Sequence, residues 1–151
     1  MSNPEKRYEQ KPKEEDPITK FLKEMPKNNF SQVKVEDFAP DGKWACQIAE
    51  YLVKGKKTKI NQLRKIFTEL KKIQLSVKRK QTFSDDDKSK LYLLMPLLAF
   101  ANARELIDNN FYKLMKVIIG DANSTKIRTK EDYERFVQFM TAIVAYHKKA
   151  E

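Results

Sequence analysis

Apolar side chains recur at helical spacing along most of the chain after about residue 40. Between residues 58 and 79 they form one continuous stripe, which predicts a long amphipathic helix with one buried face. Similar spacing predicts a helix from about Asp41 or Gly42 to Gly55, and another from Asn109 to Ile119 that stops at Gly120. The stripe of the long helix consists of Ile60, Leu63, Ile66, Phe67, Leu70, Ile73 and Val77.

Capping signals indicate where the remaining helices begin. Ser84 precedes three aspartates, and Thr129 precedes Asp132 by three residues, so both match a capping box. The segment after Ser84 is apolar nearly all round, and we expect it to be the central, buried helix, kinked or split at Pro96. Thr58 is the expected N-cap of the long amphipathic helix.

The first 30 residues differ from the rest. They hold four of the six prolines amid mixed charges and few large apolar side chains, which favours a flexible arm. The chain has only three glycines and no alternating β-branched runs, which argues against an all-β fold. The predicted fold is all-α: a charged arm over residues 1–30 and a single-domain bundle of about five helices over residues 31–151.

Composition narrows the class of protein. The longest apolar segment, Leu91–Ala103, has 13 residues, whereas a membrane span needs about 18 to 20. The N-terminus lacks the apolar stretch of a signal peptide, and Cys46 is the only cysteine, which excludes an internal disulfide. We therefore expect a cytoplasmic protein that does not contact a membrane.

The excess positive charge lies in one stretch. The chain has 31 basic and 21 acidic residues, and the segment from Lys54 to Lys80 holds eleven of the basic residues against one acid, Glu69. A protein enriched in charge throughout would not leave one segment almost free of acids. This asymmetry favours a polyanionic partner, the alternative being a solvated face that keeps the protein in solution.

The cations of the long helix lie away from its apolar stripe. At 100° per residue they form two rows about 100° apart, and neighbours in a row are about 10.5 Å apart along the axis. That spacing suits alternate phosphates of a nucleic-acid strand, with salt-sensitive and sequence-tolerant affinity. The rows are Arg64, Lys71, Lys78 and Lys65, Lys72, Arg79, and Lys54, Lys56, Lys57 and Lys59 extend them over the preceding loop.

Other candidate chemistry is sparse. Phe67 and Phe83 lie near the cations, where aromatic rings can stack on bases. Phe67 belongs to the apolar stripe and is interpreted as core, whereas Phe83 is open between stacking and a hydrophobic staple. The sole histidine, His147, is interpreted as a charge on a helix end. We expect no catalytic residue, no metal and no cofactor.

Three stretches together resemble the small subunit of the type III-A CRISPR effector, the Csm complex. They are KINQLRKIF (59–67), LLMPLLAFANAR (93–104) and EDYERFVQFMTAIVAYHK (131–148), in the same order and spacing as in that family. The resemblance covers about residues 44–149. Where the family pattern has lysines beside the central proline, this chain has Met95 and Leu97.

The resemblance implies a non-catalytic subunit of an antiviral effector, present in several stacked copies beside other Csm subunits. These copies would line the path of the guide RNA (crRNA) and the paired target RNA and contact the backbone. It also implies contacts from Arg64 and Arg104. The alternative is a helical scaffold that binds only an acidic protein partner. The expected RNA-binding residues are Lys56, Lys57, Lys59, Arg64, Lys65, Lys71, Lys72, Lys78, Arg79 and Arg104.

Overall fold

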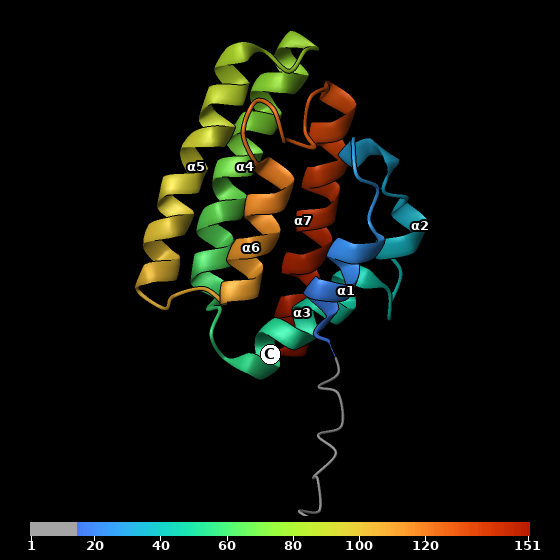
Figure 1. Cartoon of the computed structure of the whole chain (residues 1–151), viewed down its shortest axis with the longest axis vertical. Helices are drawn as coiled ribbons and strands as arrows, with labels where there is room; N and C mark the ends of the chain where they lie inside the picture. The colour runs from blue at the N-terminus through green and yellow to red at the C-terminus, as the bar shows by residue number, and fades with distance from the viewer. Residues whose placement is uncertain (1–14) are drawn as a thin grey trace, which may run out of the picture.

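The computed structural model describes residues 15–151, and every regular element in that range is helical. The all-α prediction is therefore confirmed for this part of the chain. The five predicted helices correspond to α3 through α7, and three short elements precede them. In chain order the elements are α1 (Pro17–Glu24), the 3-10 turn η1 (Phe30–Gln32), α2 (Val35–Phe38), α3 (Trp44–Gly55), α4 (Ile60–Lys80), α5 (Asp85–Ala103), α6 (Asn109–Ile119) and α7 (Lys130–Ala150) (Figure 1).

Local capping sets most helix boundaries. Both predicted capping boxes are present: the Ser84 hydroxyl accepts from the Asp87 amide, and the Thr129 hydroxyl accepts from the Asp132 amide. Each aspartate carboxylate in turn accepts a hydrogen bond from the backbone N–H of its cap residue, so two otherwise unpaired amides are satisfied per helix. The predicted cap at Thr58 is wrong by one position, because α4 begins at Ile60 with Lys59 as its N-cap.

The core is built around α7, which packs against α3, α4, α2 and η1. The Phe139 ring lies 5.0 Å from the ring of Phe21, 5.4 Å from Phe38 and 5.5 Å from Phe30. These four rings come from four segments, and all are buried. Aromatic pairs at such distances add to the stabilisation from buried apolar area. The aromatic cluster therefore joins the N-terminal segments to the C-terminal helix.

The prediction of a flexible arm up to residue 30 is wrong for residues 15–30. Asp16 caps α1 by accepting from the Thr19 amide, and Pro17 occupies the first helical turn, where a missing N–H costs nothing. Ile18, Phe21 and Phe30 are buried in the core, so a few apolar residues at helical spacing outweigh the polar composition around them. The rest of the predicted arm, residues 1–14, lies outside the described residues.

The predicted position of the third of the five helices, the apolar segment after Ser84, also needs correction. α5 runs unbroken from Asp85 to Ala103 through Pro96, so it is not split. It lies at the edge of the bundle beside α4 and α6 rather than at the centre (Figure 1). Leu91, Leu94 and Leu98 face the core, whereas the opposite side of the helix remains exposed. A helix that is apolar all round is therefore covered on one side only.

Candidate nucleic-acid interface

α4 carries most of the predicted RNA-binding cations, which with those of the preceding loop and Arg104 form the basic surface. Its apolar stripe packs Leu63, Leu70 and Val77 into the core, and the hydroxyl of Tyr133 on α7 donates to the carbonyl of Leu70 near the middle of the helix. This side is held against α7, which fixes the rotation of α4 about its axis. The opposite side must then face solvent.

The predicted RNA-binding residues on α4 all lie on that solvent side. The two rows of cations run along one helix of 21 residues, which corresponds to a length of about 30 Å. None of these side chains is buried, and the rows stay on one face because the helix is continuous. The exposed cations are Arg64, Lys65, Lys71, Lys72, Lys78 and Arg79.

Few carboxylates neutralise these cations. Within residues 15–151, the ion pairs made by α4 are Lys72–Glu69, at 3.1 Å, and Lys80–Asp87, at 3.9 Å. Both partners of the Lys72 pair are solvent-exposed, so this pair is weak, whereas Lys80 faces the buried carboxylate of Asp87. The Lys71 ammonium also lies 5.8 Å from the centre of the Phe67 ring. The described part of the chain therefore leaves most of the positive charge of α4 available to an external anion.

The loop before α4 carries three further predicted residues, and Thr58 holds it in place. Lys56, Lys57 and Lys59 are exposed, whereas Thr58 between them is buried. The Thr58 hydroxyl accepts from the Asp108 amide at 2.7 Å, and its carbonyl oxygen lies 3.3 Å from Nε2 of His147. These contacts tie the loop to the start of α6 and to the end of α7.

His147 has a different environment from the one predicted. It is buried rather than exposed at a helix end, and its Nδ1 lies 3.5 Å from the Glu151 carboxylate. Its Nε2 contact with the loop carbonyl makes it part of the anchor of the basic loop. The sequence signal for this role was the position of the residue one turn from the end of α7, on the same face as Ile143 and Met140.

Arg104 joins the same surface from another helix. It is the C-cap residue of α5 and is exposed. Together with Arg64 and Lys65 it lines a hollow of about 540 Å³ between α4 and α5. The fold thus brings a residue 40 positions away in sequence to the N-terminal end of the two rows. Its guanidinium lies 5.4 Å from the centre of the Phe100 ring.

The aromatic candidates are placed differently from one another. Phe83 is buried and stacks on Tyr133, with ring centres 5.1 Å apart, so it has a packing role. Phe67 is half-buried and packs against the core. The exposed aromatic ring beside the cations is Phe100, which sequence reasoning assigned to a buried helix. Its spacing from Leu93 and Leu97 was the signal that these three share one face.

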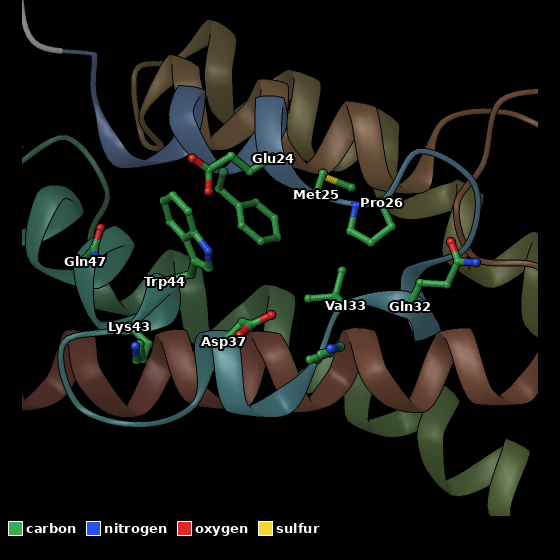
Figure 2. A pocket seen from close by; sticks show the side chains of 11 residues that line it. Glu24, Met25, Pro26, Gln32, Val33, Asp37, Lys43, Trp44 and Gln47 are labelled. Carbon is green, nitrogen blue, oxygen red and sulfur yellow. The ribbon is translucent and has the colours of Figure 1, made fainter.

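A second hollow lies away from the basic surface. It has a volume of about 570 Å³ and opens between α1, α2 and the start of α3. Figure 2 shows the indole of Trp44 in it, with the carboxylates of Glu24 and Asp37 on opposite sides. Lys34 and Lys43 also line it, so its charges balance. None of the predicted RNA-binding residues contributes to this hollow.

Comparison with protein families agrees with the resemblance noted in the sequence. A sequence model of the Csm2 Type III-A family matches residues 37–151. The chain belongs to the Csm2 Type III-A family. The matched range contains α3 to α7 complete, and with them the basic loop, α4 and Arg104. α1 and η1, which were missed in the sequence, precede the match.

Csm2 membership makes the chain a CRISPR-associated small subunit of the type III-A Csm complex. Comparisons with curated proteins and with solved structures give no match. Across residues 15–151, no helix is both long and apolar enough to span a membrane. In the same range, no three His, Cys, Asp or Glu side chains gather in the manner of a metal site.

Proposed function

We propose that this small subunit binds the sugar–phosphate backbone of RNA through the exposed cations of α4, the preceding loop and Arg104. Its place would be along the path of the guide RNA and target RNA in the effector, where several copies stack. In this proposal the subunit is not catalytic and acts by holding the RNA in position. The observation that carries the proposal is one uninterrupted helix with a solvent face of cations and almost no acids.

The geometry supports backbone contact rather than base reading. Lysine and arginine side chains spaced by about 10.5 Å along a straight helix can each meet a phosphate, whereas reading bases requires side chains aimed at base edges. Arginine adds two parallel hydrogen bonds to a phosphate, and it occurs near both ends of α4 and, as Arg104, on the α5 side of the hollow between the two helices. Contacts of this kind are insensitive to sequence, as a subunit that serves many guides requires.

The test is the salt dependence of RNA binding. The variant Arg64→Gln/Lys71→Gln/Lys78→Gln removes one row and leaves the core face of α4 unchanged. Binding of two RNAs of unrelated sequence is measured by fluorescence anisotropy between 50 and 200 mM salt, on the free chain and on the assembled effector. We expect equal weakening on both RNAs, and a slope of log affinity against log salt that is shallower by about 2 to 3 units.

The matched control removes three cations elsewhere. Lys20→Gln/Lys27→Gln/Lys34→Gln makes the same change in net charge near α1 and α2, where the side chains are also exposed. We expect this control to bind RNA nearly as the natural chain does. Equal weakening by the two triple variants would reduce the effect to net charge, and an unchanged slope in the α4 variant would refute the proposal.

The protein-only alternative makes a separate prediction. If the cations of α4 bind only an acidic protein, added RNA should not release that protein at physiological salt. Release of the partner by RNA, together with the shallower salt slope, would support RNA as the ligand of α4.

A further inference from the structure

The exposed side of α5 is strongly apolar. Of the five large apolar side chains that are exposed in residues 15–151, three lie here: Leu93 at 66%, Leu97 at 63% and Phe100 at 61%. They occur at i, i+4 and i+7, so they share one helix face over about 10.5 Å of axis. A continuous apolar stripe on an otherwise polar surface marks a place where another molecule binds.

The stripe borders a groove between α4 and α5. Two hollows, of about 540 and 320 Å³, share Glu69, Leu94 and Leu97, and together they follow the line between the two helices. One end lies at Phe100 and Arg104, and the other at Leu93 and Lys90. Figure 1 shows α4 and α5 side by side at the edge of the bundle. The groove is therefore open along its length to a molecule approaching from outside.

The rim of the groove is positively charged. Five cations border it, against one acid, Glu69, which is paired with Lys72. Lys90 is paired with Asp86 at 3.1 Å. The end near Phe100 keeps cations with no carboxylate partner in the described residues, so the rim favours a ligand with acidic edges. The five cations are Arg64, Lys65, Lys72, Lys90 and Arg104.

We propose that this groove binds an amphipathic helix of a different Csm subunit, with an apolar stripe edged by aspartate or glutamate. A helix laid in a groove buries side chains at i, i+3, i+4 and i+7, which matches a trough bordered by Leu93, Leu97 and Phe100. The inference rests on the place of this chain in the Csm complex but not on RNA contact. In this proposal the cations that border the groove have a second role, which is to pair with the acidic side chains of the bound helix.

Two other occupants fit the groove less well. A second copy of this chain using the same face would bring two positive rims together, which is repulsive. The polar backbone of RNA does not match the apolar side chains of Leu93 and Leu97, and one face of Phe100 already contacts the Arg104 guanidinium. An apolar helix with acidic edges satisfies both the leucines and the cations.

Site-specific crosslinking in the reconstituted effector identifies the occupant. The photoreactive residue p-benzoylphenylalanine replaces Leu97, which is exposed, so the substitution leaves the core intact. We expect a crosslink to a helical segment of another Csm subunit that carries acids beside its apolar face. A crosslink to a second copy of this chain, a crosslink to RNA, or no crosslink at all in an assembled effector would each overturn the proposal.

A charge-neutral variant separates this groove from the RNA surface. Leu93→Gln/Leu97→Gln should reduce incorporation into the effector at least about tenfold, because buried interface leucines are lost. The free chain should bind RNA as before, since no cation changes. Leu75→Gln is the matched control, because Leu75 is 69% exposed on α4 and lies outside both hollows. Normal incorporation of the double variant, or equal loss with the control, would refute the groove.

The RNA measurement distinguishes a failure of the proposed RNA contact from a failure of the proposed groove. If the salt slope fails to respond to the α4 triple variant while Leu93→Gln/Leu97→Gln still blocks incorporation, RNA contact by α4 fails and the groove stands. If the slope responds while incorporation of the leucine variant is normal, the groove fails and RNA contact stands.

Discussion

Asp132 is the residue whose removal should most clearly destabilise the N-terminal segments. Its carboxylate is fully buried and accepts four hydrogen bonds. Two come from the backbone before α7, from Arg128 at 3.0 Å and Thr129 at 3.1 Å. The other two come from the segment around η1, from the Ser31 amide at 2.9 Å and the Asn29 side chain at 3.2 Å. One side chain thus caps α7 and fastens a segment about 100 residues away.

The substitution Asp132→Asn changes the chemistry at nearly constant size. One carboxylate oxygen receives three of the donors and the other receives the Ser31 amide. If the side-chain amide keeps its oxygen toward the three donors, its NH₂ group faces the Ser31 N–H and one bond is lost. A hydrogen bond to a charged group contributes about 1.5–3 kcal/mol, and the remaining three become weaker when the charge is removed. We expect a loss of about 3–4 kcal/mol in the free energy of unfolding.

Equilibrium unfolding in urea measures this change. The single tryptophan, Trp44, packs 5.6 Å from the Phe21 ring, so its fluorescence reports on the N-terminal part of the core. The matched control is Glu131→Gln, which removes the same charge one residue earlier at an exposed position. A control within about 0.5 kcal/mol of the natural chain is expected. If Asp132→Asn were equally mild, the four hydrogen bonds would not stabilise the fold.

Three further outcomes follow from the core and the buried polar groups. Burial alone would raise the pKa of the Asp132 and Asp87 carboxyls, but hydrogen bonds from Ser31 and Ser76 outweigh it and leave both pKa values below the usual value of about 3.9. Their contribution is thus fully present above pH about 4 and is lost as the pH falls through the folded-state values, so acid unfolding followed by circular dichroism should be shallower in Asp132→Asn. Phe139→Ala should cost about 3–5 kcal/mol in urea unfolding, because the ring lies among three others, and Phe139→Leu should cost clearly less. Thr58→Val should lower the free energy of unfolding by about 1–3 kcal/mol, because it leaves the buried Asp108 amide unpaired. Thermal unfolding measures this loss, and the exposed-site control Thr82→Val should unfold nearly as the natural chain does.

Periodicity and capping were sufficient to predict the five longer helices. The stripe of α4 and the boxes at Ser84 and Thr129 are local signals, because a helix turn brings their partners together whatever the rest of the chain does. The exposed cations of α4 followed for the same reason. Once one side of a helix is apolar and buried, the opposite side is fixed by geometry.

The remaining features depend on contacts between distant segments. α1 was missed because prolines and charges dominate its surroundings, although Asp16 followed by Pro17 is a readable helix start. α5 was assigned to the centre because it is apolar all round, yet nothing in its own residues determines which side α4 and α6 cover. The anchor formed by Thr58, Asp108 and His147 joins residues up to 89 positions apart, so the burial of His147 could be predicted from its position on α7 but its partners could not.

Buried Thr58 has a thermodynamic consequence for ligand binding. Surface loops generally lose conformational entropy when a ligand immobilises them, and that loss subtracts from affinity. Here the centre of the loop is already fixed by the Asp108 amide and by the contact with His147. The loop therefore loses this entropy when the protein folds, and not when a phosphate binds. Only the flexible ends of Lys56, Lys57 and Lys59 remain to be ordered.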